Sequence, residues 1–144
     1  MKKIIITLLA ATMTLLCSCA ASPEANILVV RENGGHHKPF TDAAMAWLDS
    51  VSTSRNFTVT VISDMNDVNT DFLKDFNAII QLDFPPYTWP EAAQSAFREY
   101  IEKGLGGYVG FHHATLLGDF DGYPIWEWFS NFMGGIRFAG YIEP

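Results

Sequence analysis

The chain of 144 residues has the length of one domain, and it is acidic, with 16 Asp and Glu against 9 Lys and Arg and a net charge of −7. An acidic chain without a basic cluster disfavours binding to nucleic acid and electrostatic docking on anionic lipid. Both of its cysteines, Cys17 and Cys19, lie near the N-terminus. We therefore expect neither a disulfide nor a thiol nucleophile in the folded domain.

Residues 1–19 have the pattern of a bacterial lipoprotein signal peptide. Two lysines precede an apolar stretch that is too short for a comfortable membrane span. The stretch ends in Leu16-Cys17-Ser18-Cys19, where Leu at −3 and Ser at −1 favour lipidation of Cys19. An ordinary cleaved signal peptide ending near Ala20 is the alternative. We expect residues 20–26 to be a tether and the protein to sit in the cell envelope, held on a membrane by its acyl chain.

Residues 27–144 alternate predicted strands with predicted helices. In chain order the apolar periodicity and the bordering Pro and Gly residues predict a strand at 27–30, a helix at 39–51, a strand at 57–62, a short helix at 70–75, a strand at 78–82, a helix at 90–103, a strand at 108–111 and a helix at 126–133. The first helix carries one apolar stripe, formed by Ala43, Ala44, Trp47, Leu48 and Val51. The runs at 27–30 and 108–111 are typical of buried parallel strands. This order favours parallel pairing and an open three-layer α/β sandwich.

The histidines all follow predicted strands. His36 and His37 come after the first strand, and His112 and His113 come after the fourth. Asp83 follows the third strand. Open parallel sheets bind ligands outside the carboxyl ends of their strands, so these side chains are expected at one edge. We predict catalytic roles for His112, His113 and Asp83, and substrate-binding roles for His36, His37 and Trp126.

Each of these residues also has a purely structural interpretation. A His-His pair in a polar loop can be solvated, and an imidazole after a buried strand can be bonded to backbone. Asp83, like Asp64 after the second strand, can cap its own loop. Trp126 can belong to the core with the other aromatic residues of its helix.

The segment Gly110-Phe111-His112-His113-Ala114 has the spacing of a nucleophile elbow, with imidazole in place of Ser or Cys. Covalent acyl transfer is therefore disfavoured. Imidazole can act as a general base or as a metal ligand. Adjacent histidines seldom both reach one ion, and the i, i+4 spacing of common zinc sites is missing. A divalent metal is compatible with these residues but is not predicted, and the cofactor stays undetermined.

The chain resembles the ThuA-like (trehalose utilisation) domains, which share the flavodoxin-like fold of class I glutamine amidotransferases. The resemblance rests on Ile27-Leu28-Val29-Val30 and its His-containing loop, on Gly110-Phe111-His112, and on a Trp-rich helix followed by Gly134-Gly135-Ile136-Arg137-Phe138. It implies that His112 takes the place of the amidotransferase cysteine, so glutaminase activity is not expected. The family usually has a histidine shortly after this last motif, where Gly140-Tyr141 stands here.

The resemblance implies a role in carbohydrate metabolism, with trehalose or a keto-sugar derivative as the small-molecule partner. The reaction is undetermined, with a sugar hydrolase or isomerase as candidates. A non-catalytic carbohydrate-binding or scaffold module, or an inactive fragment, is the alternative, because family domains usually continue past the point where this chain stops. The sequence leaves the oligomeric state open.

Overall fold

A computed structural model describes residues 24–32, 35–116 and 122–134. These residues form one parallel four-stranded sheet with the strand order β2-β1-β3-β4. In chain order the elements are β1 (Ala25–Val30), α1 (Lys38–Arg55), β2 (Phe57–Ile62), α2 (Thr70–Leu73), β3 (Ala78–Gln81), a 3₁₀ helix (Pro86–Thr88), α3 (Glu91–Glu102), β4 (Gly107–Gly110), a second 3₁₀ helix (His112–Thr115) and α4 (Glu127–Phe132). The predicted α/β fold with a parallel sheet is confirmed.

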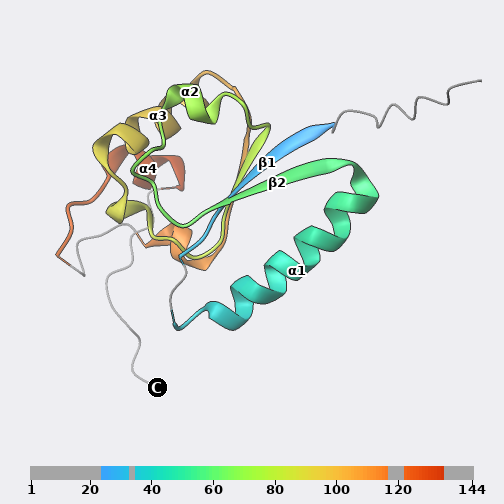
Figure 1. Ribbon diagram of the computed structural model, residues 1–144. Coiled ribbons are helices and arrows are strands. Elements are labelled where there is room, and N and C mark those ends of the chain that lie inside the picture. The colour runs from blue at the N-terminus through green and yellow to red at the C-terminus, as the bar shows by residue number, and fades with distance from the viewer. Residues whose placement is uncertain (1–23, 33–34, 117–121, 135–144) are drawn as a thin grey trace, which may run out of the picture.

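The helices lie in two layers on opposite faces of the sheet, with α1 on one face and α2, α3 and α4 on the other (Figure 1). The side chains of neighbouring residues in β1 point alternately to the two faces of the sheet, as the pleat of a strand requires. Leu28 and Val30 belong to the larger core cluster, which includes Phe97 and Phe129 of α3 and α4. Val29 points the other way and packs with Leu48 of α1. None of the helices among the described residues is long and apolar enough to cross a membrane.

Helix α1 continues four residues past the predicted end at residue 51. Its last turn is polar, so periodicity gave no sign of it, and the helix ends where Asn56 adopts a left-handed conformation with φ of 52°. The apolar stripe also packs differently from the prediction. Leu48 is buried, but the Trp47 side chain is 62% exposed beside the sheet.

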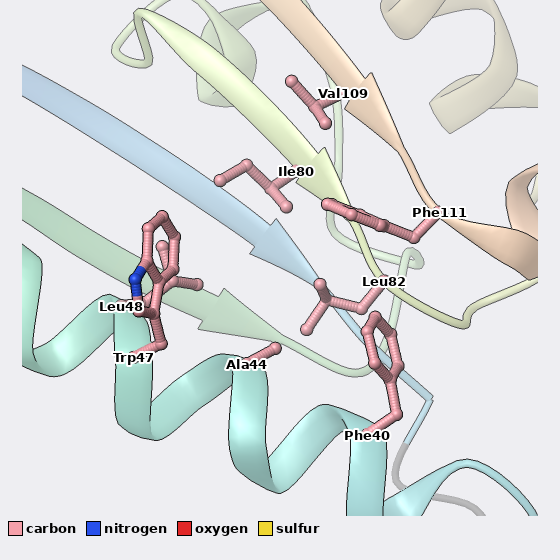
Figure 2. Close-up of a pocket in the computed structure, with 8 residues that line it drawn as sticks. All are labelled: Phe40, Ala44, Trp47, Leu48, Ile80, Leu82, Val109 and Phe111. Carbon is pink, nitrogen blue, oxygen red and sulfur yellow. The ribbon is translucent and has the colours of Figure 1, made fainter.

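Strand β4 is more open than predicted. The sequence favoured a buried strand, yet Gly107, Val109 and Gly110 are exposed. The cause is the position of α1, which packs on β1 and β2, so that no helix among the described residues covers part of the face formed by β3 and β4. Figure 2 shows the resulting apolar groove between α1 and these two strands. Its lining residues are Phe40, Ala44, Trp47, Leu48, Ile80, Leu82, Val109 and Phe111.

The strand register brings three carboxyl ends to one level. Val30 of β1 pairs with Gln81 of β3, and Gln81 pairs with Gly110 of β4. The loops after these strands therefore leave the same edge of the sheet, and residues distant in the sequence can meet there.

Candidate functional site

Three of the four histidines converge at this edge. His37 Nε2 lies 2.9 Å from His113 Nε2. The ring of His112 stacks on that of His113 with centroids 4.8 Å apart. One ring nitrogen from each of the three histidines lies within 4.8 Å of the others, so these residues together can hold a metal ion. We call His37, His112 and His113 the histidine cluster.

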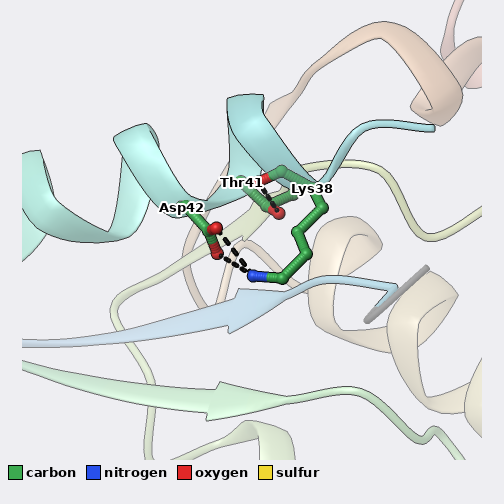
Figure 3. Close-up of polar contacts among 3 residues, drawn as sticks. All are labelled: Lys38, Thr41 and Asp42. Atoms are coloured by element: carbon green, nitrogen blue, oxygen red, sulfur yellow. Dashed lines mark hydrogen bonds and ion pairs between the residues drawn. The ribbon is translucent and has the colours of Figure 1, made fainter. Parts of the chain in front are cut away.

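His37 is placed by the start of α1. It is the N-cap residue, and its carbonyl accepts the first helical hydrogen bond from the Thr41 N–H at 2.9 Å. Pro39 favours helix initiation because its fixed φ suits the first turn. Figure 3 shows the contacts that hold this turn: Lys38 Nζ donates to Asp42 at 2.6 Å, and Thr41 Oγ1 donates to the Lys38 carbonyl at 3.0 Å.

His112 and His113 are placed by a sharp turn after β4. His112 has a φ of 38°, one of two positive values among the described non-glycine residues. The chain then enters the 3₁₀ helix, and the Ala114 N–H donates to the Phe111 carbonyl at 2.9 Å. In a continuing strand, adjacent side chains would point to opposite faces. The turn removes this alternation, so both imidazoles face His37.

Asp83 supports the histidine cluster through its backbone. His113 Nδ1 lies 2.7 Å from the Asp83 carbonyl oxygen, which can only accept, so this ring nitrogen carries the proton and donates. The Asp83 carboxylate accepts a hydrogen bond from the Glu32 N–H at 2.8 Å, and the residue is only 2% exposed. Asp83 therefore positions His113 through its carbonyl, while its carboxylate holds the loop after β1 and does not cap its own loop. A catalytic role for the Asp83 side chain stays a prediction.

The surroundings of His112 favour its neutral ring. Desolvation lowers the pKa of His112 below its usual value, and the neighbouring rings of His113 and His37 lower this pKa further. A neutral ring can accept a proton or offer a lone pair to a ligand near neutral pH.

A shallow hollow opens beside the cluster. His37, Phe40, Phe111 and His112 line it. The rings of Phe40 and Phe111 lie 5.9 Å apart, and both residues also line the apolar groove of Figure 2. Aromatic surface next to polar ring nitrogens is the combination that orients a small ligand with polar and apolar faces.

The remaining predicted residues lie apart from the cluster or outside the described residues. His36 is exposed and is not part of the cluster. Trp126 stacks on Phe129 at 5.0 Å and contacts Trp89, as its core interpretation implies, so substrate binding by His36 and Trp126 stays a prediction. Asp64 caps its own loop by accepting from the Asn66 N–H at 2.7 Å, as expected. Cys19 and the segment after Gly134 lie outside the described residues.

The sequence analysis did not predict a pair of side-chain hydrogen bonds that lies beneath the cluster. Tyr108 Oη donates to Gln81 Oε1 at 2.6 Å, and Gln81 Nε2 donates to the Phe84 carbonyl at 2.5 Å. These bonds join β4, β3 and the loop that contains Asp83. Burial also raises the pKa of the Tyr108 hydroxyl, which stays protonated as the donor. The sequence feature that could have indicated these bonds is Gln81, a polar residue inside the apolar run of β3.

The family model and the solved structures that match this chain point to the same family. The family model for ThuA, trehalose utilisation, matches residues 26–144. A solved ThuA-like protein from Bacteroides uniformis is 30% identical with a TM-score of 0.68, and the match covers 81% of this chain and 46% of that one. One from Parabacteroides merdae is 20% identical with a TM-score of 0.44, covering 62% and 32%. This chain thus spans less than half the length of either solved relative. The search of curated proteins gives no match.

Proposed function

Because the chain belongs to the ThuA (trehalose utilisation) family, we propose that it acts on a small carbohydrate, either trehalose or a keto derivative of a disaccharide. The histidine cluster is the observation that carries this proposal, because it gathers His37, His112 and His113 at the carboxyl edge of the sheet. The adjacent hollow offers Phe40 and Phe111 as an apolar surface for one face of a sugar ring.

In this proposal His112 is the general base. It is the exposed member of the cluster, and its lowered pKa increases the fraction that is neutral and able to accept a proton. His113 assists from a fixed orientation, since its Nδ1–H donates to the Asp83 carbonyl. His37 contributes a ring nitrogen from the opposite side of the cluster. His36 and Trp126 would contact more distant parts of the substrate.

Turnover measurements test this assignment. Trehalose and 3-keto disaccharides are offered to the wild type, to His112→Ala and to His36→Ala as the matched histidine control. General-base catalysis typically contributes about 100-fold or more, so we expect kcat of His112→Ala to fall by at least that factor. His36→Ala, at a proposed substrate contact, should raise KM but change kcat by no more than a few-fold. Equal rates for the wild type and His112→Ala would eliminate His112 as the base.

A second candidate is a carbohydrate-binding module without catalysis. The observation in its favour is that imidazole occupies the elbow position where a Ser or Cys nucleophile would stand. It predicts that calorimetry detects sugar binding to the wild type and to His112→Ala with the same affinity, and that neither protein converts the sugar.

The proposal also places the protein in the cell envelope as a lipoprotein. Its support is the sequence Leu16-Cys17-Ser18-Cys19 after an apolar stretch. Attachment through an acyl chain suits an acidic chain, which gains little from contact with anionic lipid.

A further inference from the structure

We propose that His37, His112 and His113 bind one divalent transition-metal ion, with zinc as the best match. The inference goes beyond the proposed function because it holds whether or not a sugar is the substrate. It replaces the general-base role of His112, because a ring nitrogen bound to the ion cannot accept a proton. It begins from the three ring nitrogens, which come from two segments of the chain and lie within 4.8 Å of one another.

The distance between the rings of His37 and His113 is close to that of two ligands on one ion. Their Nε2 atoms are 2.9 Å apart. Two imidazole nitrogens bound tetrahedrally to zinc at about 2.0–2.1 Å would be about 3.3 Å apart. An outward movement of a few tenths of an ångström between these two nitrogens would open room for the ion. Rotation of the half-buried His37 side chain can supply this movement while the His113 ring keeps its bond to the Asp83 carbonyl. The His112 nitrogen, at most 4.8 Å from the others, would move inward by up to about 1.5 Å to complete the set.

The protonation of His113 is already set for metal binding. Its Nδ1 faces the Asp83 carbonyl at 2.7 Å and must carry the proton, so in the neutral ring Nε2 offers its lone pair to the cluster. Histidine ligands commonly donate their other N–H to a backbone carbonyl, which fixes the tautomer and the ring orientation. The Asp83 loop is itself held by the bond from the Glu32 N–H.

The relative orientation of the rings also suits one shared ligand. The His37 ring stands nearly perpendicular to the other two, with interplanar angles of 77° to His112 and 87° to His113. In these different orientations, one nitrogen of each ring still lies within 4.8 Å of the others. The left-handed backbone of His112 creates this arrangement, and such backbone strain clusters at functional sites.

The donor set indicates the class of metal. Neutral imidazoles suit zinc and its transition-metal neighbours, whereas magnesium and calcium prefer oxygen ligands. Three protein ligands leave a fourth tetrahedral position, which is the arrangement of catalytic zinc sites. His112 lies on the exposed side of the cluster. The open position would therefore be reachable by water or by a substrate oxygen.

The test uses the purified chain after removal of metal with a chelator. Co²⁺ is titrated in as a spectroscopic substitute for zinc, and visible absorption distinguishes tetrahedral from octahedral coordination. We expect one equivalent to bind with the intense tetrahedral spectrum, and zinc to displace it. Absence of this spectrum in the wild type would overturn the proposal.

Variants identify the ligands. His37→Gln and His113→Gln should weaken Co²⁺ binding by about 100-fold or more, because loss of a ligand exceeds the 10–100-fold typical of its supporting partners. His112→Asn should do the same, and Asn tolerates the left-handed backbone at this position. His36→Gln is the control and should bind as the wild type does. Equal weakening by His36→Gln would contradict the assignment.

Two further measurements keep the outcomes separate. Circular dichroism shows whether a variant is folded, and if one is not, the wild-type titration decides the question. The titration contains no sugar, so failure to bind metal would leave the carbohydrate proposal standing. A chain that binds metal but converts no disaccharide would support the metal site and contradict the carbohydrate proposal.

Discussion

Gly110 allows the chain to turn directly after β4. A Cβ at this position would lie 2.6 Å from Tyr108 Oη and 2.7 Å from Ala114 Cβ. Ala114 is fully buried, and its backbone is fixed by the bond to Phe111. The close approach of the strand to the following 3₁₀ helix therefore requires glycine. The same turn gives His112 its positive φ and directs two histidines to one side.

Gly110→Ala is predicted to destabilise the protein by about 1–3 kcal/mol, because the added methyl group must push Ala114 or Tyr108 aside. Gly107→Ala is the matched control in the same strand, since its Cβ would meet only Ala78 Cβ at an ordinary 3.8 Å. Urea unfolding of the three proteins measures the difference. Identical midpoints for the Gly110 and Gly107 variants would show that the turn accommodates a side chain.

At the scale of elements, a buried hydrogen-bond chain ties β4 to β3 and to the loop below the cluster. Tyr108→Phe removes the donor to Gln81 Oε1, leaving a fully buried amide oxygen without that bond. We expect the free energy of unfolding to fall by about 1–3 kcal/mol. The exposed Tyr123→Phe should change it by no more than about 0.5 kcal/mol. Equal effects of the two changes would argue against a structural role for the Tyr108 hydroxyl.

The elements that could be predicted from sequence are those with a local signal. Phe57–Ile62 is identified as a strand by its β-branched and aromatic residues. The exposure of Val109 could not be predicted in this way, because an apolar run identifies a strand but not which helices cover it. For the same reason Trp47 was predicted on the packed stripe of its helix, whereas its side chain is largely exposed.

The convergence of three histidines was predicted more accurately than its geometry. The rule for open parallel sheets correctly gathered His37, His112 and His113 at one edge. Their close grouping could not be derived, because it depends on the φ of His112 and on the Asp83 carbonyl. Neither a backbone angle nor a carbonyl direction is encoded by residue type alone. The prediction for Asp83 concerned its side chain and stays a prediction, whereas the contact with His113 is made by its backbone carbonyl.

At the scale of the whole molecule, the lipoprotein proposal concerns where the domain is held. Cys19→Ser is predicted to remove the acyl chain and to move the protein from the membrane fraction to the soluble fraction, because β1 to α4 provide no membrane-spanning helix of their own. Cys17→Ser is the control at the neighbouring cysteine and should leave fractionation unchanged. Labelled fatty-acid incorporation measures both variants, and equal incorporation into both would contradict lipidation at Cys19.

The contact between His37 and His113 joins residues 76 positions apart in the chain. Such a distant contact forms only after loop-closure entropy has been overcome by pairing of the intervening strands. While the protein is being synthesised, β1 and β3 can pair before β4 has been made, so the centre of the sheet can precede the histidine cluster. No short segment of the chain contains the cluster, and its assembly therefore coincides with a late step of folding.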